Sequence, residues 1–131
     1  MAWTADKNPL PELVEEPDVL DLKARQLANL IRQSKHFIVF TGAGISTSAG
    51  IPDFRGPEGA WTLQAQGRQR TTAAVSTLQA MPTLTHMALV ELQNRGSMAY
   101  LVSQNCDGLH RRSGILPVRS LRPSTNYPNP V

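Results

Sequence analysis

The chain has 131 residues, of which 40% are apolar, 5% aromatic and 18% charged, and its formal net charge is +3. This length permits one compact domain, and the composition is not that of a highly charged disordered chain. So small a net charge gives no direct nucleic-acid signature, because nucleic-acid-binding modules carry a denser basic face.

The single cysteine, Cys106, excludes an intramolecular disulfide and a zinc site built from several thiolates. The chain does not open with a basic segment followed by an apolar stretch, so no signal peptide is evident. The longest apolar runs are far shorter than a membrane span, and no membrane association is expected. We therefore expect an intracellular protein.

The first third of the chain predicts an arm, a helix and a strand. Residues 1–17 are polar and acidic with three prolines, which predicts a mobile N-terminal arm. Asp18 offers an N-cap and leucines recur at helical spacing, so a helix is expected over about 18–34. The wholly apolar run 37–40 predicts a strand buried on both faces, as in a parallel sheet.

The next segments predict a crossover between parallel strands. Small residues over 41–50 suit a tight turn that opens a helix, and the long polar stretch 51–82 indicates a functional loop or lid. Thr83 can cap a helix that ends at Gly96, and residues 100–102 predict a second strand. Residues 37–103 therefore predict a strand–helix–helix–strand unit of an α/β fold with a parallel pair.

The turn after the first strand carries the clearest chemical signal. Gly42 and Gly44 allow close backbone approach, and N–H groups at a helix start can bind phosphate. The turn is not a G-x-G-x-x-G fingerprint, because Thr47 stands at the third glycine position, and it has no phosphate-loop lysine. Spacing alone leaves phosphate binding and a plain tight turn both open.

Two further polar clusters follow the predicted strands. Asp53, Phe54 and Arg55 lie between a proline and a glycine, where they form either a pocket wall or a surface Asp–Arg pair. Residues 103–108 follow the second strand. Ligands of open parallel sheets bind beyond the carboxyl ends of the strands, so we expect both clusters at one edge of the sheet.

These motifs resemble a known family. Residues 42–46 with 50–56, and residues 104–110, resemble the two signature motifs of the sirtuins, the NAD-dependent protein deacylases. Residues 56–62 and 82–87 are similar to the branch that includes the nuclear, chromatin-associated sirtuins. The resemblance runs from about residue 17 to Pro117, which identifies 18–117 as the N-terminal part of a Rossmann-like, parallel-sheet NAD-binding domain.

The resemblance implies a role for each matching residue. Ala43 and Gly44, in the turn that begins at Gly42, would lie against the NAD pyrophosphate, with Ser46 nearby. Asp53, Phe54 and Arg55 would line the dinucleotide and nicotinamide region, and Trp61 would lie in the mobile cofactor loop. Gln104 and Asn105 would hold the nicotinamide-side ribose. Asp107 would hydrogen-bond the carboxamide of nicotinamide. The substrates implied are acylated lysines of proteins, histones among them, in the nucleus.

The pattern departs from the family after Pro117. In sirtuins a Leu-His-Gly element about fifteen residues beyond the second motif supplies the catalytic base, but residues 118–127 contain no histidine. The family also implies zinc, whose four cysteine ligands are absent from this chain. We therefore expect a C-terminally truncated sirtuin with no catalytic histidine, no metal site and a divergent, proline-rich tail over 118–131, inactive on its own.

Several residues have simpler interpretations that compete with a functional one. His36 is expected at the surface, whereas His86 and His110 are expected to be structural. Cys106 is expected to pack, and Trp61 to belong to the cofactor loop rather than merely to cover a core edge. Arg111 and its neighbour Arg112 predict a solvated pair, with an acidic partner as the alternative.

Three functions compete on these grounds. The first is membership of the NAD-dependent protein-lysine deacylases as an incomplete copy, and the second is a module that binds NAD or ADP-ribose, or competes for partners, without catalysis. The third, an unrelated reductase-type nucleotide domain, is disfavoured by Thr47 and by the lack of an acidic residue about 20 positions on. Nothing in the sequence indicates an oligomeric state.

Overall fold

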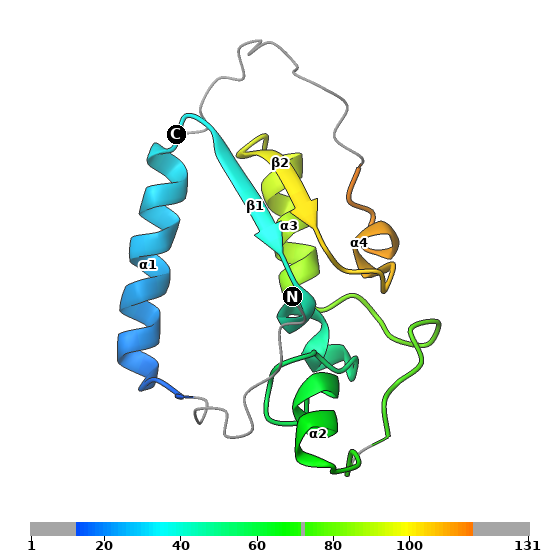
Figure 1. The fold of residues 1–131 in the computed structure, drawn as a ribbon. Coiled ribbons are helices and arrows are strands. Elements are labelled where there is room, and N and C mark those ends of the chain that lie inside the picture. The colour runs from blue at the N-terminus through cyan, green and yellow to red at the C-terminus, as the bar shows by residue number, and fades with distance from the viewer. Residues whose placement is uncertain (1–12, 72, 117–131) are drawn as a thin grey trace, which may run out of the picture.

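The computed structural model describes residues 13–71 and 73–116. The predicted tail over 118–131 and most of the predicted arm lie outside these residues. The elements run in the order α1 (Pro17–Gln33), β1 (Phe37–Thr41), η1 (Ala43–Ala49), α2 (Ala60–Gln66), α3 (Leu84–Asn94), β2 (Met98–Ser103) and α4 (Leu109–Arg112), where η1 is a 3-10 helix (Figure 1).

The predicted parallel pair is confirmed. β1 and β2 form a parallel two-stranded sheet in which Val39 pairs with Leu101 and Thr41 with Ser103, so both strands end at the same edge. The crossover contains η1, α2 and α3, and α2 lies inside the stretch that was expected to be only loop. The strand ends place residues 42–46 and 104–107 beside each other.

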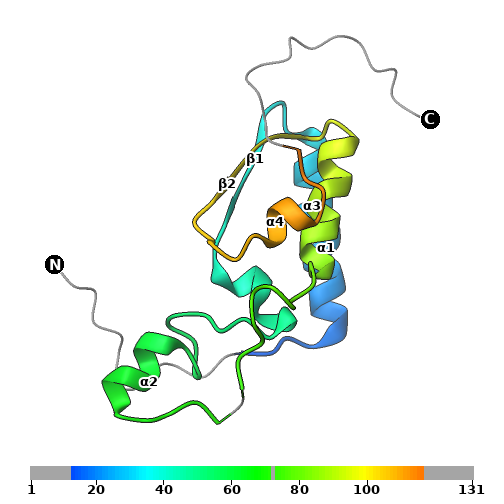
Figure 2. The same cartoon turned by 90° about the vertical axis from the view of Figure 1, so that its right-hand side faces the viewer.

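Only one face of the sheet is covered by helices within the described residues. Figure 2 shows α1, α3 and α4 on the same side of the two strands. The side chains of Ile38 and Phe40 on the other face are 56% and 69% exposed, and those of Tyr100 and Val102 beside them are exposed too. The prediction that residues 37–40 are buried on both faces is therefore wrong for this structure.

The long N-terminal helix begins at Pro17, one residue before the predicted start, with the proline in its first turn. None of its residues is buried, and its leucines stay exposed. A cavity of about 410 Å³ separates its C-terminal half from α3, lined on the α1 side by Ala28, Ile31 and Arg32. No helix in the described ranges is both long and apolar enough to cross a bilayer.

The buried interior is unusually polar. Its apolar members are Leu63, Ala80, Leu89, Met98 and Leu109, and an equal number of polar side chains is buried: Thr41, Ser46, Thr62, Thr83 and His86. Four of the five polar residues belong to β1, η1 or the start of α3. Because buried polar groups need partners, this concentration points to an organised hydrogen-bond network beyond the strand ends.

Candidate functional site

The turns after β1 and β2 are fastened together at the carboxyl edge of the sheet. The Gln104 backbone N–H donates to the Thr41 carbonyl at 3.2 Å, and Asn105 Nδ2 donates to the Gly42 carbonyl at 2.9 Å. A Cβ added to Gly42 would stand 2.7 Å from Gln104 Nε2, so the end of the Gln104 side chain lies against this glycine. Two motifs about 60 residues apart in the sequence thus form one surface.

Ser46 and Asp107 form a second fastening between the same turns. Ser46 is fully buried, and its hydroxyl donates to Asp107 Oδ2 at 2.6 Å. Asp107 Oδ1 accepts from the Leu109 backbone N–H at 2.8 Å, so the carboxylate also holds the first turn of α4. Gly108, between them, has φ +74°, a conformation that L side chains rarely adopt and that re-aims the chain after Asp107.

A threonine–histidine cluster lies behind these turns. Thr83 caps α3 in a capping box with His86, and its hydroxyl donates to the Ile45 carbonyl at 2.9 Å. His110 Nε2 lies 2.9 Å from Thr41 Oγ1, and the His86 and His110 rings meet edge to face with centroids 4.8 Å apart. Both histidines are structural, as expected from the sequence.

Burial is the main cause of the shift in both histidine pKa values. It lowers the pKa of His86 below the ordinary value of 6.5, and the nearby His110 lowers it further. Burial likewise lowers the pKa of His110, and the Asp107 carboxylate opposes the shift at both rings. Both imidazole rings of this cluster are therefore uncharged at neutral pH.

The segment after η1 forms a separate, more open group. Both carboxylate oxygens of Asp53 accept from the Gly56 backbone N–H at 3.1 Å, closing a tight turn. The Phe54 and Trp61 rings pack with centroids 5.0 Å apart, and the Arg55 guanidinium lies 5.2 Å from the Trp61 ring centre. The Asp53 carboxylate thus shapes its own loop.

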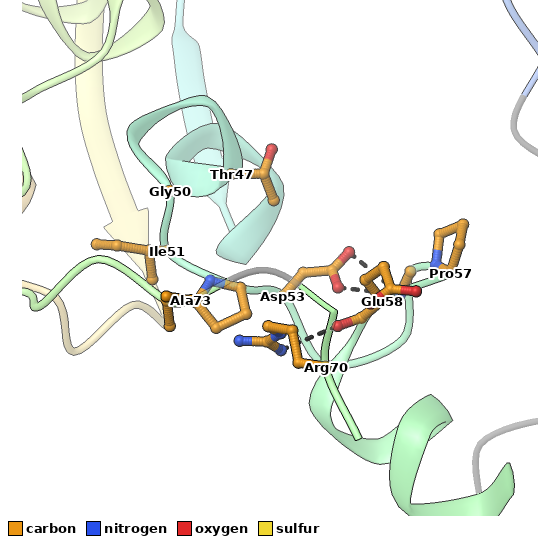
Figure 3. Close-up of a pocket in the computed structure, with 11 residues that line it drawn as sticks. Thr47, Gly50, Ile51, Asp53, Pro57, Glu58, Arg70 and Ala73 are labelled. Carbon is orange, nitrogen blue, oxygen red and sulfur yellow. Dashed lines mark hydrogen bonds between the residues drawn. The ribbon is translucent and has the colours of Figure 1, made fainter. Parts of the chain in front are cut away.

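A cavity of about 540 Å³ lies between η1 and this loop (Figure 3). Its wall includes Thr47, Gly50 and Asp53, and Arg70 closes one side by donating from Nη2 to the Glu58 carbonyl at 2.9 Å. This volume is in the usual range for small-molecule sites. The cavity connects the loop that carries Asp53 with the helix that follows the glycine turn.

The structure gathers the predicted residues into two groups. Residues Gly42, Ala43, Gly44 and Ser46 meet Gln104, Asn105 and Asp107 at the strand ends, while Asp53, Phe54 and Arg55 lie in the following loop and Trp61 lies in the first turn of α2. A Cβ on Gly44 would meet no atom within 4 Å, so its backbone is open to a ligand. This opening beside fixed polar groups fits a dinucleotide approaching the turn.

Sequence reasoning did not anticipate how the buried cluster joins the site. Each of His86 and His110 was expected to have a structural role. No feature of the sequence predicted that the two rings contact each other or that His110 contacts Thr41. The Thr-x-x-His spacing at 83–86 is the available signal, because it is that of a capping box. Cys106 was expected to pack, but its side chain is exposed, because the turn after β2 aims it outward.

Arg111 and Arg112 are both exposed, as expected for a solvated pair, but Arg112 makes further contacts. Its guanidinium donates to the Leu78 carbonyl at 3.0 Å and to the Thr77 carbonyl, so it ties α4 to the long connection. Across residues 13–71 and 73–116, no three histidine, cysteine, aspartate or glutamate side chains gather as a metal site would require.

The sequence of this chain is similar to those of known proteins of one family. The profile of the "Sir2 family" matches residues 69–126. NAD-dependent protein deacetylase SRT1 of Oryza sativa subsp. indica is 55% identical over 106 residues, which cover 81% of this chain and 22% of that protein. Sirtuin-7 of Homo sapiens is 50% identical over 104 residues, 79% of this chain and 26% of that protein.

Solved structures from the same family are also similar to this chain. The structure titled "Sir2-p53 peptide-NAD+" has a TM-score of 0.54 and 34% identity, covering 69% of this chain and 41% of that one. Another, titled "Structural Basis for the Mechanism and Regulation of Sir2 Enzymes", has a TM-score of 0.57 and 32% identity, covering 73% and 44%.

The parallel strands and the glycine turn at their carboxyl edge thus place the molecule among the Rossmann-like α/β proteins. Residues 69–126 match the Sir2 family, and the relatives and solved structures that resemble this chain carry sirtuin, Sir2 or NAD-dependent protein deacetylase names. It spans about a quarter of the length of the plant and mammalian relatives that it matches.

Proposed function

We propose that this chain forms the nicotinamide-side part of the NAD site of an NAD-dependent protein-lysine deacylase. The proposal is carried by two hydrogen bonds that join the glycine turn to the turn after β2. Asn105 donates to the Gly42 carbonyl, and Ser46 donates to Asp107. These bonds fix a bare backbone, at Gly44, next to polar side chains that the family motif assigns to the cofactor.

Each group of residues has a physical task in this proposal. Ala43 and Gly44 present backbone N–H groups to the pyrophosphate, with Ser46 behind them. Gln104 and Asn105 orient the ribose. Asp107 accepts from the carboxamide through lone pairs that its bonds to Ser46 and Leu109 leave unused.

The loop that carries Asp53, Phe54 and Arg55, together with Trp61 at the start of α2, closes over the cofactor and excludes water from it. The packed pair of Phe54 and Trp61 gives this loop its apolar surface, since both rings remain partly exposed and free to cover a ligand. NAD supplies the ribose carbon that receives the acyl group when nicotinamide leaves. Excluding water protects that carbon from hydrolysis and strengthens the polar contacts around it.

The acyl donor proposed is an acylated lysine of a protein, histones included. It is supported by relatives named protein deacetylases and by a Sir2 structure whose title describes a propionylated peptide. A nuclear location is proposed from the motifs shared with the chromatin-associated branch and from the similarity to sirtuin-7.

One observation favours a second function, the binding of NAD or ADP-ribose without turnover. His86 Nδ1 and His110 Nε2 face threonines within the fold, and the remaining nitrogen of each ring is buried. Neither ring can therefore reach a ligand as a general base. The described residues bind and orient but hold no histidine in a position to take a proton from the ribose.

Titration calorimetry of the 131-residue chain with NAD tests the proposal, with nicotinamide release from NAD and an acetylated peptide as a second measurement. We expect binding that Gly44→Val abolishes, because the added side chain fills the open space at the turn. Ala99→Val, at an exposed position in β2 away from the turn, is the control and should bind as the unmodified chain does. Binding without release supports the second function, and no binding contradicts both.

A further inference from the structure

Two buried ring nitrogens in the threonine–histidine cluster have no hydrogen-bond partner. They are His86 Nε2 and His110 Nδ1. His86 is fully buried, and its ring meets that of His110 edge to face. A buried polar atom without a hydrogen-bond partner costs folding free energy. Because these two atoms lie on adjacent rings, one arrangement can supply the missing partner to both.

The backbone fixes the tautomer of His86. His86 Nδ1 faces the Thr83 N–H at 3.2 Å and Thr83 Oγ1 at 2.8 Å. The N–H can only donate, so Nδ1 carries a lone pair and the proton of the neutral ring resides on Nε2. His86 Nε2 is therefore a donor without an acceptor. The unpaired atom of the neighbouring ring, His110 Nδ1, becomes an acceptor without a donor if His110 carries its own proton on Nε2, where Thr41 Oγ1 lies 2.9 Å away.

We propose that His86 and His110 form a directional hydrogen-bond relay that positions the cofactor turn. The two unpaired nitrogens do not bond to each other directly, so the relay runs from the Thr83 N–H to His86 Nδ1, from His86 Nε2–H through one buried water to His110 Nδ1, and from His110 Nε2–H to Thr41 Oγ1. It gives each unpaired nitrogen the partner that it lacks. A water in this position accepts from His86 Nε2–H and donates to His110 Nδ1, so the order of the donors and both tautomers stay fixed.

The relay holds the glycine turn from both sides. Thr41 immediately precedes Gly42, and its hydroxyl is held by His110. Ile45 immediately follows Gly44, and its carbonyl is held by the Thr83 hydroxyl. Since Thr83 and His86 belong to the same capping box, α3 fixes the start and the end of the turn together. His86 and His110 are thus positioning residues, and the proposal that they serve NAD binding rests on the function proposed above.

The first test needs no variant. Long-range ¹⁵N–¹H NMR of the imidazoles at neutral pH is expected to show both rings as the Nε2–H tautomer with unprotonated Nδ1. An Nδ1–H tautomer or a charged ring at either position would overturn the relay. This outcome does not depend on NAD, so it separates failure of the relay from failure of the proposed function.

The second test measures the turn itself by amide hydrogen exchange over residues 42–45. His110→Leu removes the donor to Thr41 and is expected to speed exchange there about tenfold, as for the loss of one buried hydrogen bond. His110→Gln keeps an N–H near the position of Nε2 and should restore slow exchange. His36→Leu, at an exposed position, is the matched control.

NAD affinity links the relay to binding. His110→Leu should weaken it about tenfold, and His110→Gln should largely restore it. Equal exchange and equal affinity in His110→Leu and the unmodified chain would contradict the positioning role. Slower exchange in the glutamine variant than in the leucine variant supports it even if NAD does not bind, in which case only the proposed function fails.

Discussion

Ser46 Oγ donates a 2.6 Å hydrogen bond to Asp107 Oδ2 across 61 residues of sequence. The donor is fully buried and the acceptor is a carboxylate, which makes this a charge-assisted bond. It joins η1 to the turn that begins α4. The two signature motifs of the chain therefore support each other structurally before any ligand is bound.

Replacing Ser46 by alanine should destabilise the fold. We expect Ser46→Ala to lower the free energy of unfolding by about 1.5–3 kcal/mol, the range for a hydrogen bond to a charged group. Urea denaturation followed by circular dichroism measures this. Ser48→Ala, at an exposed position in the same helix, should change the free energy by less than about 0.5 kcal/mol. Equal losses in the two variants would show that the bond contributes nothing specific.

The loop after η1 should be sensitive to a single added methyl group. A Cβ on Gly56 would lie 2.3 Å from Asp53 Oδ2, and this carboxylate accepts the Gly56 N–H. Gly56→Ala should displace Asp53 and cost about 1–3 kcal/mol of unfolding free energy. Gly44→Ala is the matched control for stability, since its Cβ would meet nothing within 4 Å. A Gly56 variant as stable as the Gly44 variant would refute this account of the loop.

Much of this fold was predictable because its signals are local. The apolar run after residue 36, the Thr83 cap and the stop at Gly96 gave the strand, the helix and its end within a residue or two. The parallel pairing followed from the length of the crossover, which a hairpin could not accommodate. The meeting of the Gly42 and Gln104 turns followed from parallel pairing alone.

The failures involve contacts made by distant parts of the chain. An apolar run such as 37–40 carries no information about whether a helix covers each face, and Ile38 and Phe40 are exposed within the described residues. Helical spacing predicted a helix over about 18–34, close to the observed Pro17–Gln33, but not that its leucines stay exposed. The contact between His86 and His110 depends on how α4 turns back after Gly108, which no local pattern specifies.

Glu58 should control access of proteases to the connection after α2. Its carboxylate pairs with Arg68 at 3.1 Å, and its carbonyl accepts from Arg70. The ion pair is exposed and contributes little to global stability. We expect Glu58→Ala to leave the unfolding midpoint nearly unchanged yet to speed tryptic cleavage after Arg68, whose carboxylate partner it removes, more than after Arg70, whose bond to the Glu58 carbonyl it keeps, measured by mass spectrometry of timed digests.

The matched control for this cleavage is Glu91→Ala. It removes a comparable exposed pair, Glu91 with Arg95 at 2.7 Å, from the helix α3. Cleavage after Arg68 and Arg70 should then proceed as in the unmodified chain. If both variants speed cleavage there equally, the effect comes from general loosening and not from the contacts of Glu58.

The buried histidines predict a loss of stability in acid. The pKa values of His86 and His110 lie below 6.5 in the folded chain, chiefly through burial, and return to about 6.5 on unfolding. Below that pH the unfolded chain binds protons that the folded chain does not, so the free energy of unfolding falls as pH falls. The stability that the neutral rings contribute is fully present above about pH 6.5 and is lost as pH drops towards the folded-state values.

Urea midpoints between about pH 7 and about pH 5 measure this loss. The Asp107 carboxylate favours the charged rings and reduces the slope without reversing it, since burial is the larger effect on both. The double variant His86→Asn, His110→Gln removes both titrating rings, so its stability should depend less on pH over this interval. A slope as steep in the double variant as in the unmodified chain would assign the acid sensitivity to other groups.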